Sequence, residues 1–407
     1  MVRAHGKKSL PPELVDELQR HRSKLHGDRN SVESVFLDCV LDKVDGRYHY
    51  STYLALPLFA RVLDAPGGTV SALSMSRLLV ADAARFEIRA LHHRTPRPLR
   101  MAPRSPVVAK RVHLALRYLH GHRRSSGVSP QALAAPADAL LDQLPGTDNP
   151  VLARLLATTV LPVDTLHDEY LFLRVLQAYE LTFAGLAARA GSVTAALRDG
   201  RAADARAALD TAAASLEGSG PLFSMLATMN TAAFREFRQF TEGASAIQSE
   251  RYKRFELACG SPEPDRFDSA AFHSVPAVRD SVPVTDTITD AYLDGVASGR
   301  LDPSAAAVVS AGLARLERAH QHWKSTHHSL AGRALGDAGG SGYTAGVPYL
   351  KAALNNRLFW RLGDLTHRDG DAPAAPRQPT QWETSVHTPH RHTAIDGDAV
   401  ARGGSIR

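Results

Sequence analysis

The chain has 407 residues, 44% of them hydrophobic, and a formal net charge of +6. This length accommodates one large domain or two domains of ordinary size. The two cysteines, Cys39 and Cys259, are too few for a disulfide framework, so we expect a reducing, cytoplasmic location. No uninterrupted apolar run reaches the roughly 18 residues of a membrane span, and the basic first residues lack the apolar segment of a signal peptide.

Alternation of apolar and polar residues, which is typical of a half-buried strand, does not recur along this Ala-, Leu- and Arg-rich chain. The sequence therefore predicts an all-α fold. Residues 85–124 carry about eleven arginines and lysines but a single acid, Glu87. No interleaving of aromatic residues supports base stacking, so we expect a solvated basic face rather than a nucleic-acid surface.

Composition divides the chain into five parts. We expect a polar, basic arm or exposed helix at residues 1–30 and the start of the core at residues 31–64. Turn-rich stretches such as RTPRPLRMAPRSP and LPGTDNP alternate with short amphipathic segments over residues 65–164, which predicts an inserted helical subdomain. The main core is expected at residues 165–367. Residues 368–407 have little apolar content and are expected to form a disordered tail.

Long helices are predicted in the main core. The first covers residues 164–190, with Asp164 or Thr165 as its N-cap and with Asp168 and Glu169 in its first turn, where acidic side chains suit the helix dipole. Further helices are expected at residues 194–218, 221–240, 286–300, 303–335 and 349–365, and residues 260–285 read as a Pro-rich loop.

Four histidines lie on the helix predicted at residues 303–335: His320, His322, His327 and His328. Trp323 and His327 are one turn apart and are neighbours on the helix surface. The histidines could be exposed or capping residues, zinc ligands, or the source of one axial haem ligand. No cysteine or acid cluster accompanies them as a zinc site would require, whereas haem iron needs only one neutral imidazole on a packed helix.

Two further stretches have functional and structural interpretations. The segment GDAGGSGYTAG lacks the Gly-Lys-Ser/Thr of a phosphate-binding loop and the spacing of a dinucleotide fingerprint, so it is either a loop that approaches a ligand or a flexible connector. Arg235, Arg238, Arg251 and Arg254 lie between residues 234 and 256. One of them could bind a carboxylate through two hydrogen bonds, and the alternative is surface charge.

Four motifs in order resemble the tryptophan 2,3-dioxygenase family, whose members are histidine-ligated haem-dependent aromatic oxygenases. They are YHYSTYLAL, HDEYLFLRVLQAYELTF, TMNTAAFREFRQFTEGASAIQS and HWKSTHHSLAGRALGDAGGSGYTAGVPYL. The resemblance covers residues 48–64 and 165–365, and it is poor over residues 260–310. It implies an all-helical fold, a b-type haem and a homotetramer in which an N-terminal segment of one subunit completes the pocket of a neighbour.

The resemblance also implies roles for individual residues. His327 matches the proximal haem ligand, with Trp323 one turn before it, and Arg238 matches the arginine that binds the substrate carboxylate. The remaining matches are substrate-pocket and haem-pocket positions: Phe172 as an apolar wall, Tyr50 and Tyr53 of the opening motif, Ser245 near the haem, and Ser341 at the position of a threonine that holds the substrate ammonium group.

The chain departs from the family pattern at the distal histidine. Leu176 occupies that position, with HDE before it and Q-x-YEL after it. Leucine cannot accept a hydrogen bond from an indole N–H or move a proton. The insertion at residues 65–164 and the C-terminal tail are two further departures.

The resemblance implies an enzyme that acts on an aromatic amino acid with O2. The first hypothesis is a haem-dependent oxygenase of the indole ring of L-tryptophan or a derivative, in specialised metabolism. The second is a haem-dependent monooxygenase or rearrangement enzyme for another aromatic amino acid such as tyrosine. The third is a non-catalytic protein that binds haem or an aromatic ligand. A homo-oligomer, dimer or tetramer, is expected, and neither a membrane nor a nucleic-acid partner is expected.

Overall fold

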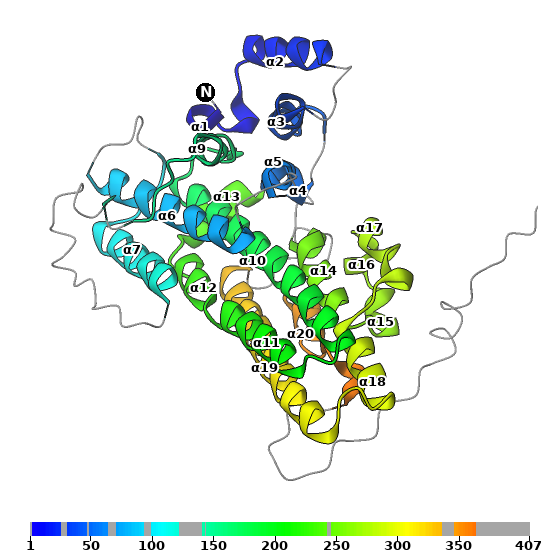
Figure 1. Ribbon diagram of the computed structural model, residues 1–407. Helices are drawn as coiled ribbons and strands as arrows, with labels where there is room; N and C mark the ends of the chain where they lie inside the picture. Colours follow the sequence, from blue (N-terminus) through cyan, green and yellow to red (C-terminus); the bar gives the residue numbers. More distant parts are fainter. Residues whose placement is uncertain are drawn as a thin grey trace, which may run out of the picture.

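The computed structural model describes residues 2–25, 31–46, 49–63, 71–92, 99–121, 141–142, 144–241, 246–335 and 346–363. Within these ranges the regular structure is helical, and the one β-type pairing is an isolated bridge between Arg100 and Leu166. The predicted all-α fold is confirmed (Figure 1). The tail predicted to be disordered lies outside the described residues.

The helices before the central one form two groups. The N-terminal group comprises α1 (Val2–His5), η1 (Lys7–Ser9), α2 (Pro12–Lys24), α3 (Val32–Leu41), α4 (Tyr50–Tyr53) and α5 (Leu56–Leu63). The second group, from the segment predicted to be an insertion, comprises α6 (Ala72–Leu91), α7 (Ser105–His120) and α9 (Pro150–Thr158).

The remaining helices build the larger part of the molecule. In chain order, the first of them are α10 (His167–Arg198), α11 (Ala202–Glu217), α12 (Gly220–Leu226), α13 (Thr231–Arg238), η3 (Ala246–Gln248) and α14 (Glu250–Cys259). The rest are α15 (Pro264–Phe267), α16 (Ala270–His273), α17 (Pro276–Arg279), η4 (Val282–Val284), α18 (Ile288–Ala297), α19 (Pro303–Leu335), α20 (Val347–Ala353) and η5 (Trp360–Leu362).

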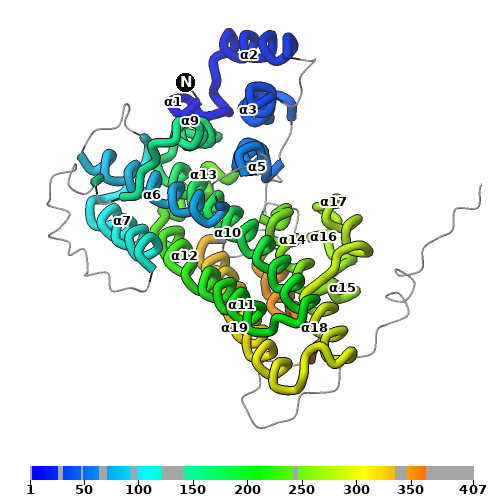
Figure 2. Tube along the Cα trace, in the orientation of Figure 1, coloured from blue at the N-terminus to red at the C-terminus, as the bar shows by residue number. Residues whose placement is uncertain are grey.

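Helix α10 is the centre of the fold. It packs against α6, α11, α14 and α18, and Figure 2 shows it crossing the middle of the molecule with α11 and α19 alongside. By length and composition α10 could also cross a membrane, which the absence of an uninterrupted apolar run did not lead us to expect. However, 72% of its most apolar window is buried inside the protein, as in the core helix of a folded domain.

The start of α10 differs from the prediction. The helix begins at His167 with Leu166 as an N-cap that has no side-chain hydrogen bond, so the capping role predicted for Asp164 or Thr165 is wrong. Asp164 instead accepts the N–H of Thr165 and pairs with Lys8, while Glu169 in the first turn binds the backbone ahead of the helix. The Glu169 carboxylate accepts the backbone N–H groups of Val163 at 2.7 Å and of Asp164 at 2.9 Å, so it fixes the chain that enters the helix.

Other boundaries also differ. Helix α10 continues to Arg198, so residues 194–198 belong to it and not to the helix predicted next. The helix predicted at residues 221–240 is two helices, because the Asn230 side chain accepts the N–H groups of Ala232 and Ala233 and starts α13 there. The Pro-rich residues 260–285 contain short helices rather than only loop. Helix α19 has the bounds that were predicted.

A buried network of charged groups joins α6, α7 and α10. Arg111 of α7 donates to Glu87 at 2.8 Å and to Asp168 at 2.7 Å, and His167 Nε2 lies 3.2 Å from the other Glu87 oxygen. All four side chains are almost fully buried. Glu87, the single acid of the basic stretch, is therefore an internal partner for Arg111, and part of that stretch is core rather than surface.

The predicted insertion is not separate from the core in space. The apolar residues of α6 and α7 belong to the same hydrophobic cluster as those of α10, α11 and α19. The first residues are likewise attached, because Lys7 is buried against Asp42 at 2.8 Å and Lys8 contacts Asp164 at 2.5 Å. That residues 65–164 are additional to the family's fold stays a prediction. Cys39 and Cys259 are both buried, and neither forms a disulfide within the described residues.

We predict that Arg111→Leu lowers the free energy of unfolding by about 3–5 kcal/mol, because it leaves Glu87 and Asp168 buried without their cation. Urea denaturation followed by circular dichroism measures the change. Arg117→Leu, an exposed position on the same helix, is the matched control and should change stability little. Equal effects of the two substitutions would contradict the role of the network.

The pH dependence of stability tests the role of Glu169. Burial raises the pKa of Glu169 to about 7 even though two backbone N–H groups and the Tyr53 hydroxyl donate to it. Between about pH 4.5 and 7 the unfolded chain loses this proton first, so the free energy of unfolding should fall as the pH rises, by on the order of 3 kcal/mol from this group. Glu169→Gln should flatten that slope in urea titrations at several pH values. A slope identical to that of the native protein would contradict this assignment.

Candidate active site

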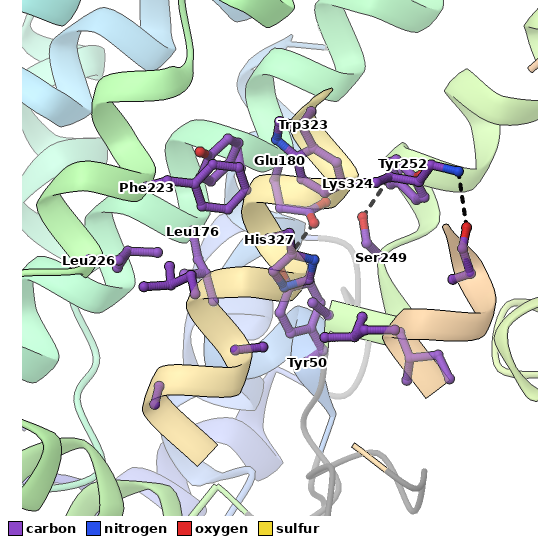
Figure 3. A pocket seen from close by; sticks show the side chains of 18 of the residues that line it. Tyr50, Leu176, Glu180, Phe223, Leu226, Ser249, Tyr252, Trp323, Lys324 and His327 are labelled. Carbon is purple, nitrogen blue, oxygen red and sulfur yellow. Dashed lines mark hydrogen bonds between the residues drawn. The ribbon is translucent and has the colours of Figure 1, made fainter. Parts of the chain in front are cut away.

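A cavity of about 300 Å³ lies among α4, α10, α13, α14, α19 and α20 (Figure 3). Every predicted site residue in the described part of the chain lines it. These residues are Tyr50, Tyr53, Phe172, Leu176, Arg238, Trp323 and His327. They come from four helices that are distant in sequence, so it is the packing of α4, α13 and α19 on α10 that brings them together.

Helix α10 presents a stripe of residues to the cavity that includes Phe172, Leu176 and Glu180, each one turn from the next. Phe172 and Leu176 are partly exposed between buried neighbours, as expected for side chains that line a hollow. The Phe172 ring lies 5.7 Å from the ring of Phe234 and 5.3 Å from that of Phe237. Leu176 packs against the same cluster, so this end of the cavity has an apolar, aromatic wall.

His327 lines the cavity from α19. Its ring centroid lies 5.4 Å from that of Trp323, one turn earlier, and 5.9 Å from the stacked ring of Phe223. Burial and, to a smaller extent, the neighbouring His328 lower the pKa of His327 to about 4. Its imidazole is therefore neutral near pH 7, which is the form that binds metal.

The other three histidines of α19 do not line the cavity. His320 is buried, and its Nε2 lies 2.7 Å from the hydroxyl of Tyr252. His322 is exposed and His328 is half-buried. No three His, Cys, Asp or Glu side chains of the described ranges come together as a metal ion would need, which argues against the zinc alternative for that part of the chain.

The donor set fits a haem iron. An axial haem ligand is one neutral imidazole on a packed helix, and the porphyrin itself fills the equatorial positions. His327 meets that requirement, and the residues that follow it on the same side of α19 are small or apolar: Leu330, Ala331 and Ala334 line the cavity too. A flat apolar ring would therefore meet few polar groups along this helix.

Arg238 lines the cavity at the end of α13, one residue after Phe237 of the aromatic wall. It is half-buried, and burial lowers its pKa from the usual value. Arg235 is exposed, Arg254 pairs with the exposed Glu250, and Arg251 does not line the cavity. Of the four arginines singled out in the sequence, only Arg238 is placed to meet a ligand in this cavity.

Tyr50 and Tyr53 reach the cavity from α4 of the same chain. The Tyr50 hydroxyl donates to Glu180 at 3.1 Å and the Tyr50 backbone N–H donates to Gln248 at 3.0 Å. The Tyr53 hydroxyl donates to Glu169 at 3.2 Å. The two tyrosines are thus fixed to α10, and the pocket of this chain has its own copy of the opening motif.

The lining of the cavity also includes charged residues that the sequence analysis did not select. Arg266 contacts Glu256 at 2.6 Å and donates to the hydroxyl of Tyr349 at 3.3 Å. Although burial opposes ionisation, Arg266 holds the pKa of Glu256 below its usual value. Lys253 is almost fully buried, donates to the carbonyl of Ile247, and has its pKa lowered to about 7, first by burial and then by Arg266.

Ser245 and Ser341 lie outside the described residues, as does most of the Gly-rich loop. The first described residues after them in sequence, Ala246 and Gly346, both line the cavity. The sequence analysis did not select Glu180, Lys253 or Glu256, although their spacing could have indicated them. Glu180 is one turn after Leu176, and Lys253 and Glu256 are three residues apart, so each pair shares a helix face. The Arg266 partner was not predictable from spacing because it lies on a separate short helix.

Comparison with known proteins supports the same assignment. Residues 152–274 match the family model described as tryptophan 2,3-dioxygenase. A tryptophan 2,3-dioxygenase of Anaeromyxobacter sp. (strain K) is 26% identical over 224 residues, which cover 47% of this chain and 84% of that protein. One from Nocardioides sp. (strain ATCC BAA-499 / JS614) is 27% identical over 226 residues, which cover 48% and 84%. The predicted resemblance is confirmed: the chain is similar to the tryptophan 2,3-dioxygenases, which are oxidoreductases.

Proposed function

We propose that this protein is a haem-dependent oxygenase that acts on the aromatic ring of an α-amino acid, with L-tryptophan or a tryptophan derivative as substrate and O2 as co-substrate. The observation that carries the proposal is that His327, which is neutral, the aromatic wall and Arg238 all line the same cavity. A role in specialised metabolism is part of the proposal and follows from the departure at Leu176.

Each side chain has a stated task in this proposal. The haem, held by His327 and flanked by Trp323, supplies the binding and activation of O2. Arg238 binds the carboxylate of the amino acid through its planar guanidinium group, and its partial burial strengthens that interaction. Phe172 and the neighbouring phenylalanines hold the aromatic ring and exclude water. Ser245 and Ser341 stay candidates for contacts with haem and with the substrate ammonium group.

Leu176 favours a second candidate function. Leu176 faces the cavity from the apolar wall, and its side chain cannot accept a hydrogen bond from an indole N–H. An N-substituted indole, or a different aromatic ring such as that of tyrosine, has no indole N–H and so would lose no hydrogen bond at residue 176. Monooxygenation or rearrangement of such an amino acid is therefore the alternative function. The third hypothesis is a non-catalytic protein that binds haem or an aromatic ligand.

We further propose that one chain completes its own pocket, even if the protein forms the homo-oligomer expected from its family. Gln177 donates to the carbonyl of Leu54 at 3.0 Å, and Arg174 contacts Asp82 of α6 at 2.7 Å. The segments before and after the connection thus dock on neighbouring turns of α10. Residues 64–71 join them and span at most roughly 30 Å, which favours docking on the same chain.

His327→Ala should abolish haem binding, because it removes the neutral imidazole that faces the cavity. The measurement is the Soret absorbance per mole of protein after reconstitution with haem. His322→Ala, an exposed position on the same helix, is the matched control and should retain full occupancy. Full occupancy in His327→Ala would contradict the assignment and point to His320, His322 or His328.

Leu176→His should strengthen the binding of L-tryptophan relative to N-methyl-L-tryptophan, because the imidazole gives the indole N–H an acceptor. A neutral hydrogen bond contributes about 0.5–1.5 kcal/mol, so the ratio of the two dissociation constants should change by roughly two- to tenfold. Titration of the haem-loaded variant and the native protein, followed by absorbance, measures the ratio. An unchanged ratio would show that residue 176 does not face the substrate.

Complementation tests whether the pocket is completed within one chain. A variant with Tyr50→Ala and Tyr53→Ala lacks the α4 contribution, and His327→Ala lacks the axial ligand. Coexpression of the two variants should restore no response to substrate, because each chain keeps its own defect. Recovery of a substrate-induced spectral change in the mixture would mean that α4 serves the pocket of a neighbouring subunit.

A further inference from the structure

The residues of α10 that line the cavity change from apolar to acidic over one turn. Leu176 lies among apolar side chains, whereas Glu180, about 6 Å further along the helix axis, carries a carboxylate. Figure 3 shows Glu180 directed to the same part of the pocket as Tyr50 and His327. Tyr179 also lines the cavity, but its hydroxyl donates to the carbonyl of Ser219 at 3.2 Å.

The Glu180 carboxylate is only half satisfied. Its Oε1 accepts the hydroxyl of Tyr50 at 3.1 Å, while its buried Oε2 makes no hydrogen bond of normal length in the described part of the chain, although the Ser249 side chain is close enough to stabilise the carboxylate. Burial raises the pKa of Glu180, and the nearby Ser249, Arg251 and Tyr50 offset part of that effect. A buried acceptor without a donor is unfavourable, so a ligand donor that reached Oε2 would relieve a cost already present in the empty pocket.

Building on the proposed function, we propose that Glu180 determines substrate specificity by accepting a hydrogen bond from a donor on the substrate's aromatic ring. The pocket then has an acceptor at residue 180, one turn further along α10 than Leu176, which offers none. The substrate class that fits is an aromatic α-amino acid whose ring carries a hydroxyl group. Tyr50 is the positioning residue, because its hydroxyl occupies Oε1 and leaves Oε2 for the ligand.

The test compares amino acids that differ by one ring hydroxyl, namely L-tyrosine with L-phenylalanine and 5-hydroxy-L-tryptophan with L-tryptophan. Calorimetric titration of the haem-loaded native protein should show a preference for a hydroxylated member. Glu180→Gln should reduce that preference by about tenfold or more, as for loss of a hydrogen bond to a charged group. The amide keeps Oε1 for Tyr50 and turns its NH2, a donor, toward the ligand, so the shape of the pocket is preserved.

Glu250→Gln is the matched control, because it makes the same change at an exposed carboxylate of α14 that does not line the cavity. It should leave the preference unchanged. An equal preference in the native protein and in Glu180→Gln, with aromatic amino acids still bound, would overturn this inference and leave the proposed function standing. A shift of the Soret band in Glu180→Gln without a change in preference would likewise overturn it and assign Glu180 to the haem side. Failure of all four amino acids to bind would overturn both proposals.

Discussion

The buried ion pairs at the start of α10 are the constraint on which the site depends. Arg111 links Glu87 of α6 to Asp168 of α10, and Glu169 binds the backbone that leads into the helix. These groups are buried, so each is unfavourable unless all partners are in place. They therefore fix the position and rotation of α10, which decides that Phe172 and Leu176 face the cavity and that their neighbours do not.

The HDE triplet illustrates how a motif can mark a function without taking part in it. His167, Asp168 and Glu169 are all occupied by partners of the same chain, and none of them lines the cavity. The residues that face the ligand follow one and two turns later. In this chain the triplet maintains the geometry of α10 and leaves contact with the ligand to other residues.

Much of the site was predictable because it resides in ordered motifs. The resemblance selected Tyr50, Arg238 and His327 from three distant segments, and the described structure brings all three to one cavity. The histidine could not have been chosen by spacing alone, since four histidines share α19. What separates them is burial and partners, and the Tyr252 hydroxyl that engages His320 is 68 residues away in sequence.

The parts that escaped prediction share a physical cause. The start of α10, the role of Glu87, and the Glu256–Arg266 pair all depend on buried charges whose partners come from outside their own helix. Local propensity carries no information about such partners. The same is true of Glu180: its helical spacing from Leu176 is visible in the sequence, but its unsatisfied oxygen is visible only once the packing of α4 is known.

The central claim is a haem pocket for an aromatic amino acid, and one absorption spectrum tests it most directly. The purified protein is measured as isolated, after haem reconstitution and after reduction, with and without L-tryptophan and L-tyrosine. The account predicts a Soret band that shifts when at least one of these amino acids is added. The absence of a Soret band even after reconstitution would contradict it, because His327 and the cavity beside it would then serve another purpose.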